Sequence, residues 1–224
     1  MGARVCAGVG ARLALVVAWL SSGASAGATL SSDELAAACA QAEGQAHCAR
    51  KVEEIQLKRL PNLATRDGNT LRVSLYPTGV ATFTDTEALN GGRTFALWDF
   101  VSEINTAVLF VTDGGNASFI ALQRTSGRRT DLPAEPKLSP DRTRLATADF
   151  CASRCVNELA IWRVTKEGVQ KELAWKPAEP WVDAGVTWKG ADTVLVEYTP
   201  AGHSDGATLE RRLTDASWRR IDAP

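Results

Sequence analysis

The sequence predicts an all-β fold of successive strand meanders that follow a helical segment, and three observations favour it. From Thr70 onward, short runs that are apolar or alternate in polarity recur, which is the pattern of half-buried strands. Tight-turn sequences such as Asp113-Gly114-Gly115 separate the runs. Phe95, Glu135 and Pro180, taken as the starts of equivalent units, lie 40 and 45 residues apart, a spacing typical of repeated four-stranded sheets.

The first 26 residues precede this fold and have the three parts of an export signal. Arg4 and Arg12 give a basic start, an apolar run follows at 13–20, and small residues at 24–26 form a cleavage site. A run of eight residues is far shorter than the roughly 20 that span a bilayer, and no later run approaches that length. We therefore expect residues 1–26 to be cleaved. The mature chain is expected in the periplasm or secreted, without a membrane span.

A helical segment is expected at residues 27–66. Ser31 and Glu34 form a capping box, in which each side chain accepts a hydrogen bond from the other residue's backbone N–H. Gly44 interrupts the helical pattern and Pro61 ends it, so the segment is one bent helix or two short ones. Its apolar face should pack on the β domain. That face is formed by residues spaced three and four apart: Leu35, Cys39, Ala42, Ala46, Ala49, Val52 and Ile55.

The β domain is expected at residues 67–224. Its clearest unit is the stretch 135–175, which we interpret as one four-stranded meander opened by a turn at 139–141. The strands expected in the domain are 71–75, 80–84, 95–104, 107–112, 117–123, 144–150, 158–164, 169–175, 186–188, 194–198, 207–213 and 218–221.

Within this unit, a Ser-Pro-Asp turn at 139–141, an Arg-Leu-Ala strand from Arg144 and a Leu-Ala-Ile-Trp strand at 159–162 follow one another. This order resembles the WD-like repeats of periplasmic β-propellers such as that of the Tol system. The resemblance covers one unit and implies a propeller-like array of about four sheets. The sequence contains three full units and a fragment at 70–84, so it leaves two arrangements for how the array ends. The fragment joins the C-terminal strand in a composite fourth sheet, or the sheets stack open; a two-sheet β-sandwich is the alternative.

Four cysteines remain after residue 26, and an even number in an exported chain favours disulfides, with three pairings available. On one straight helix, Cys39 and Cys48 would lie about 13.5 Å apart. A disulfide needs roughly 4.4–6.8 Å between Cα atoms, so this pair requires the chain to fold back near Gly44. Cys151 and Cys155 flank a hairpin tip, which brings opposite residues close together. We favour two local disulfides. Neither pair has the spacing of a zinc site.

The sequence Gly202-His-Ser204-Asp-Gly206 matches the Gly-x-Ser-x-Gly motif of serine hydrolases. That motif requires a strand, a strained turn and a helix, with an acid and a histidine later in the chain. No histidine follows Gly206, and His203 is badly placed to take the serine proton. We therefore favour a polar hairpin loop, with a serine hydrolase as the alternative.

Six tryptophans remain in the mature chain, and rings of this size fill the space between sheets or form a flat platform for a sugar. Trp98, Trp162 and Trp188 lie in or beside expected strands and are assigned to the core. Trp175 and Trp181 flank the loop 176–180 and are the candidates for an exposed ligand platform, although packing is favoured for both.

Charge and missing motifs narrow the function. Without Arg4 and Arg12 the chain has 23 basic and 26 acidic residues, a net charge of −3, and no basic patch, which argues against nucleic-acid binding. There is no phosphate-binding glycine loop, no complete catalytic triad and no metal-ligand spacing, so no cofactor is expected. The hypothesis is an exported, non-catalytic binding or interaction module of the bacterial cell envelope. Its partner is an envelope protein or a cell-wall carbohydrate.

Overall fold

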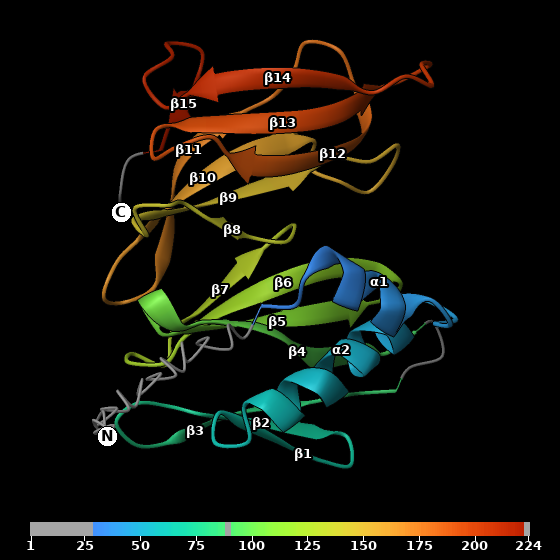
Figure 1. Ribbon diagram of the computed structural model, residues 1–224, viewed down its shortest axis with the longest axis vertical. Coiled ribbons are helices and arrows are strands. Elements are labelled where there is room, and N and C mark those ends of the chain that lie inside the picture. Colours follow the sequence, from blue (N-terminus) through green and yellow to red (C-terminus); the bar gives the residue numbers. More distant parts are fainter. Residues whose placement is uncertain (1–28, 88–90, 222–224) are drawn as a thin grey trace, which may run out of the picture.

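The computed structural model describes residues 29–87 and 91–221, so the predicted export signal at 1–26 lies outside the described residues. The described chain is mostly β-strand, arranged in four antiparallel sheets beside two α-helices (Figure 1). The all-β class with a helical segment before it is therefore confirmed.

The helical segment is two helices, α1 (Ser32–Cys39) and α2 (Gln45–Arg59). The capping box at α1 is present: the Glu34 N–H donates to Ser31 Oγ over 3.2 Å, and the Ser31 N–H donates to Glu34 Oε2 over 2.9 Å. Gly44 precedes the first residue of α2, and the chain folds back between the helices. The Cys39–Cys48 disulfide closes this reversal, with 4.7 Å between Cα atoms.

Within each sheet the strands lie side by side in the order in which they occur along the chain, except for β15. Short turns favour this order because they join antiparallel neighbours. Sheet one is β1 (Ala64–Asp67), β2 (Thr70–Ser74) and β3 (Val80–Thr84). Sheet two is β4 (Arg93–Val101), β5 (Thr106–Asp113), β6 (Asn116–Gln123) and β7 (Arg129–Leu132), with a 3-10 turn η1 (Ser102–Ile104) after β4.

Sheet three has β8 (Lys137–Leu138), β9 (Arg144–Asp149), β10 (Glu158–Val164), β11 (Val169–Trp175) and, beyond β11, the C-terminal β15 (Arg219–Arg220). Sheet four is β12 (Trp181–Trp188), β13 (Thr193–Pro200) and β14 (Ala207–Arg212). The strand β1 begins at residue 64, so the expected boundary between helical segment and β domain at 66/67 falls inside sheet one.

Three apolar cores lie between consecutive sheets. The first joins sheets one and two, the second sheets two and three, and the third sheets three and four. Strand β10 shows the arrangement: Leu159 and Ile161 are in the third core, while Ala160 and Trp162, which alternate with them, are in the second. Both faces of sheet three are therefore buried, which explains why β10 is apolar almost throughout.

The four sheets form an open stack, with sheets one and four at opposite ends (Figure 1). Their outer faces are polar, as Thr65, Arg72 and Thr82 are exposed on sheet one and Glu197 and Thr208 on sheet four. A polar outer face needs no neighbour, so nothing drives the two ends together. No sheet closes residues 29–87 and 91–221 into a ring, and the two-sheet sandwich does not describe these four sheets.

Of the two alternatives for closure, the sheets stack open, and the composite fourth sheet is not formed. The C-terminal strand β15 pairs with β11, through Leu173 opposite Arg220, and not with the fragment at 70–84. The reason is the neighbouring Trp218, which is 5% exposed in the third core. Its Nε1 donates to the Arg212 carbonyl over 2.8 Å, which holds the C-terminal segment beside sheet three.

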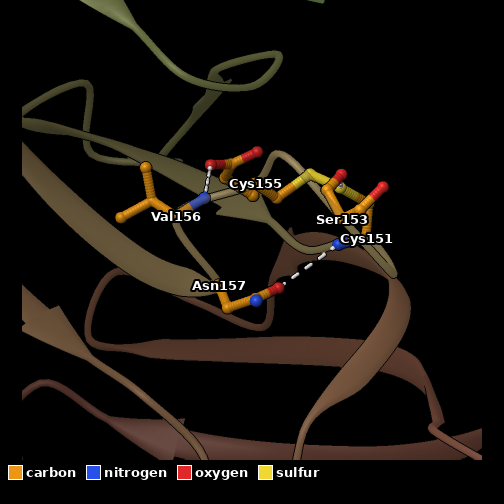
Figure 2. Close-up of a disulfide and its surroundings, with 6 residues drawn as sticks. Cys151, Ser153, Cys155, Val156 and Asn157 are labelled. Carbon is orange, nitrogen blue, oxygen red and sulfur yellow. Dashed lines mark hydrogen bonds between the residues drawn. A yellow bond between two sulfur atoms is a disulfide. The ribbon is translucent and has the colours of Figure 1, made fainter.

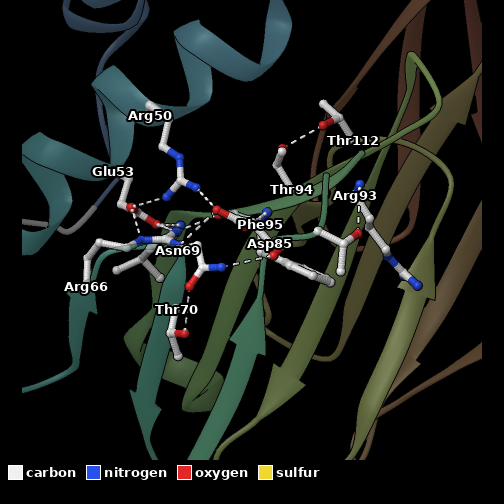
Figure 3. Close-up of polar contacts among 12 residues, drawn as sticks. Arg50, Glu53, Arg66, Asn69, Thr70, Asp85, Arg93, Thr94, Phe95 and Thr112 are labelled. Atoms are coloured by element: carbon white, nitrogen blue, oxygen red, sulfur yellow. Dashed lines mark hydrogen bonds and ion pairs between the residues drawn. The ribbon is translucent and has the colours of Figure 1, made fainter. Parts of the chain in front are cut away.

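A buried ionic cluster attaches α2 to the edge of sheet two (Figure 3). Glu53 accepts two hydrogen bonds from Arg66, at 2.8 and 2.9 Å, and one from Arg50 at 2.9 Å. It also accepts the Leu97 N–H of edge strand β4 over 2.8 Å. Asp85 pairs with the same two arginines and accepts the Phe95 N–H over 2.8 Å. Through Glu53, helix α2 thus accepts a hydrogen bond from a backbone N–H of β4 that would otherwise be unpaired at the sheet edge.

Candidate functional site

The structure does not support Trp181 as an exposed ligand platform. Trp181 is 5% exposed, and its ring stacks on Tyr198 with 3.8 Å between centroids. Strand β12 begins at this residue, five positions before the expected strand at 186–188, and directs the ring into the third core. Trp175 is half-buried, with the Arg211 guanidinium 4.2 Å from its ring centroid. Neither tryptophan lines any of the cavities discussed below.

The Gly202–Gly206 motif lies in an exposed turn between β13 and β14. A nucleophile elbow joins a strand to a helix, whereas this turn joins two strands of one sheet. The Ser204 hydroxyl donates to its neighbour Asp205 over 3.4 Å, and exposed His203 does not contact it. The turn therefore has the form of a polar hairpin loop.

Both favoured disulfides are present. Cys151 and Cys155 are joined across the β9–β10 turn with 5.5 Å between Cα atoms (Figure 2). Two hydrogen bonds support the turn: the Val156 N–H donates to Asp149 over 2.7 Å, and the Cys151 N–H donates to Asn157 Oδ1 over 3.4 Å. The thiols are used in disulfides, and residues 29–87 and 91–221 contain no group of three His, Cys, Asp or Glu placed to hold a metal ion.

One cavity draws residues from three of the four sheets. It has a volume of about 410 Å³ and lies at the C-terminal ends of β4 and β12, beside β8 and η1. These three strands are the first strands of sheets two, three and four. We call it the first-strand groove and define it by its chemistry-bearing residues: Asp99, Glu103, Glu135, Lys137, Thr187 and Trp188.

Hydrogen bonds fix the walls of the first-strand groove. Glu135 accepts the Trp98 Nε1–H over 3.1 Å through one carboxylate oxygen and contacts Lys137 Nζ at 2.8 Å through the other. The Trp188 Nε1–H donates to the Lys137 carbonyl over 2.8 Å. The ring of Trp188 is half-buried against the third core and also lines the groove. Side chains from sheets two, three and four are therefore held in one fixed arrangement.

The pKa values of two carboxyl groups in the groove are shifted in opposite directions. Burial raises the pKa of Asp99, and the Glu135 carboxylate raises it further, against hydrogen bonds from Thr29 Oγ1 at 2.9 Å and the Phe100 N–H at 2.7 Å. The pKa of Glu103 is lowered by hydrogen bonds from its own backbone N–H and the Ser102 hydroxyl. The groove thus combines a carboxyl that holds its proton more readily with one that remains an acceptor.

Two other polar features are weaker candidates for a ligand site. One is a cluster with a structural role, and the other is a cavity lined by exposed side chains. The Glu53–Arg66–Asp85 cluster has each carboxylate hydrogen-bonded within the protein, and it joins α2 to two sheets. A cavity of about 470 Å³ on the outer face of sheet four is lined by exposed Asp183 and Glu197. The first-strand groove, by contrast, has a tryptophan beside polar groups that are hydrogen-bonded to neighbouring residues.

No protein-family model matches this chain, and no curated protein is similar to it in sequence. No helix within residues 29–87 and 91–221 is long and apolar enough to cross a membrane.

Sequence reasoning did not find the groove. Trp188 was assigned to the core, and Asp99, Glu135 and Lys137 carry no local motif. A usable signal was nevertheless present: Glu135-Pro-Lys137 opens the third unit and Trp188 ends the first strand of the fourth, so both lie in or beside the first strands of neighbouring sheets.

Proposed function

We propose that the protein is an exported, non-catalytic binding module of the bacterial cell envelope, with the first-strand groove as its ligand site. The observation that carries the proposal is the groove itself: Asp99, Lys137 and Trp188 come from three sheets and are held around one cavity. A concave site with a few fixed polar groups and an aromatic wall is the usual form of a ligand site.

The resemblance of the unit at 135–175 to propeller repeats supports this location. In an array of that kind the first strand of each sheet faces the common axis, where ligands bind at the openings between sheets. Strands β4, β8 and β12 occupy the equivalent positions in this open stack. The periplasm is the proposed compartment, since two disulfides persist in oxidising surroundings.

A binding role is favoured over hydrolysis because the candidate nucleophile has no base. Ser204 lies in an exposed turn, hydrogen-bonded only to Asp205 among the described residues. An activated serine needs a base within hydrogen-bonding distance, itself oriented by a third group.

The test is a capture experiment with matched variants. The mature wild-type protein and an Asp99→Asn/Lys137→Met variant would be immobilised and exposed to fractionated envelope extract, and retained compounds identified by mass spectrometry. An Asp183→Asn/Glu197→Gln variant is the control, because it removes two carboxylates that line a different cavity. We expect a compound that wild type and control retain unchanged and the groove variant loses, with each of the three proteins unfolding in a single cooperative transition.

Equal retention by all three proteins would contradict the groove as the site. Release of a chemically altered compound that depends on Ser204 or on the groove carboxyls would contradict the non-catalytic role.

A further inference from the structure

The first-strand groove places the Trp188 side chain beside hydrogen-bonding groups, and we infer that its ligand is a neutral or amino-bearing saccharide. This inference rests on the proposed function and names the class of ligand. The central residue is Trp188, whose Nε1–H is used by the Lys137 carbonyl. The bond restrains the orientation of the ring, which lines the groove and also packs against the third core. A preorganised ring of this kind binds the apolar C–H face of a pyranose without losing rotamer freedom.

The polar groups around the ring suit vicinal hydroxyls. Glu103 is an exposed carboxylate that can accept, and Thr187 contributes an exposed hydroxyl that can both donate and accept. Carboxyl and hydroxyl groups at neighbouring positions can accept from one sugar hydroxyl and donate to the next. The groove therefore offers both halves of the hydrogen-bonding pattern that a sugar presents.

The charge of the groove restricts which saccharide fits. Asp99, Glu103 and Glu135 line it against a single lysine, and Lys137 is already paired with Glu135 at 2.8 Å. A uronic acid or a phosphorylated sugar would meet repulsion from these carboxyls, and the one lysine that lines the groove is already paired. Neutral and amino sugars avoid this cost.

A peptide fits the groove less well. An extended peptide binds by adding a strand to an open sheet edge, which requires free backbone groups on that edge. Around the groove several of those groups are occupied: Gln56 donates to the Trp98 carbonyl over 2.9 Å, the Phe100 N–H donates to Asp99, and the Lys137 carbonyl accepts from Trp188. Strand β8 is only two residues long. The edge of β4 at the groove is thus partly blocked, and β8 is too short for strand addition.

The experiment is a titration with defined tetrasaccharides, followed by isothermal calorimetry and by saturation-transfer NMR. The probes are the tetramers of N-acetylglucosamine, glucose, glucosamine and galacturonic acid. Wild type should bind at least one of the first three with a Kd in the millimolar range or tighter, and the galacturonic acid tetramer at least about tenfold more weakly.

Two tryptophan variants provide the control. Trp188 and Trp175 are both half-buried against the third core, so replacing either by alanine removes similar packing, but only Trp188 lines the groove. Trp188→Ala should weaken the Kd at least about tenfold, Trp188→Phe should recover part of the loss, and Trp175→Ala should change it less than about twofold. A larger loss in Trp175→Ala than in Trp188→Ala would overturn the assignment of the ring.

The failures of the two proposals are distinguishable. If no tetrasaccharide binds but the envelope capture yields a peptide or protein that the groove variant loses, the saccharide class is wrong and the binding module stands. If neither experiment shows a ligand that depends on groove residues, both proposals are wrong.

Discussion

Glu53 is the residue on which the attachment of the helical segment depends most. Its side chain is 3% exposed and accepts hydrogen bonds from Arg50, Arg66 and the Leu97 N–H. An ionised carboxylate at this depth is tolerated because two guanidinium groups and a strand N–H surround it. Its neighbour Glu54 lies on the opposite, solvent side of α2, where its side chain is 60% exposed.

Replacement of Glu53 by glutamine should therefore be costly and replacement of Glu54 should not. Glu53→Gln removes the negative charge between two arginines and leaves Arg66 with Asp85 as its remaining carboxylate partner. We expect a loss of at least about 2 kcal/mol in the free energy of unfolding for Glu53→Gln, against about 0.5 kcal/mol or less for Glu54→Gln. Urea denaturation of the two variants measures the difference. Equal effects would show that the cluster does not attach the helix.

Asp99 makes a second residue-scale prediction, about pH. Burial raises its pKa in the folded protein, so the native state binds its proton more tightly than the unfolded chain does. The stability of the protein should then fall as pH rises from the ordinary aspartate value of about 4 through the raised value. Asparagine cannot ionise, so Asp99→Asn should have a higher Tm than wild type at pH 7 and the same Tm near pH 3.

The matched comparison for Asp99 is Glu103, because hydrogen bonds lower the pKa of Glu103. Its contribution has the opposite sign: it is present above the ordinary glutamate value and lost as pH falls through the lowered one. Glu103→Gln should thus have a Tm at pH 7 equal to or slightly below that of wild type. Thermal scans across this pH range would contradict the account if Asp99→Asn were less stable than wild type at pH 7.

At the scale of elements, the two disulfides close two local reversals of the chain. One joins α1 to α2 across 9 positions, and the other joins the ends of a turn between β9 and β10 across 4 positions. The turn at 151–155 includes Arg154 with a φ of 75°, and Asn157 follows with a φ of 53°. Such left-handed conformations are uncommon outside glycine, and the disulfide holds the backbone that contains them.

Removal of the turn disulfide should have a local and moderate effect. A cross-link that closes a ring of this size restricts the unfolded chain by about 2 kcal/mol, and Cys151→Ser/Cys155→Ser should lose about that much stability. Amide hydrogen exchange should increase at 150–157 and remain unchanged in α1 and α2. The Cys39→Ser/Cys48→Ser variant should show the reverse distribution. Faster exchange throughout the molecule in either variant would mean that the disulfides act globally.

At the scale of the whole molecule, the stack is held by three cores in series and ends in two polar faces. On sheet one, Thr65, Arg72 and Thr82 lie opposite one another across the three strands and are exposed. Val80, on the same strand as Thr82, is 56% exposed. The internal sheets differ from this one in having two apolar faces, so the polarity of the end face is what stops the stack from adding another sheet.

An apolar end face should therefore cause self-association. Arg72→Val/Thr82→Val creates an apolar patch with Val80 on the outer face of sheet one. We expect this variant to form dimers or larger species at micromolar concentrations, while a control with Arg72→Lys/Thr82→Ser retains the wild-type mass. Analytical ultracentrifugation distinguishes the two. A wild-type sedimentation coefficient for the valine variant at all concentrations would show that end-face polarity does not limit the stack.

Features that depend on neighbouring residues were predictable from the sequence. The capping box at Ser31, the chain reversal at Gly44 and the two local disulfides all follow from interactions within about ten positions. The expected strand at 158–164 matches β10, in which Leu159 and Ala160 lie on opposite faces. Each of these is determined by backbone geometry and by side chains that are already close along the chain.

Features that depend on distant partners required the tertiary structure. The burial of Trp181, the pairing of β15 with β11, and the first-strand groove join segments far apart in the sequence. The short strands β1 and β7 were missed for the same reason, because each is stabilised by its partner strand and not by its own four residues. A sheet places side chains according to which strands pair and which sheets stack, and local sequence patterns do not contain that information.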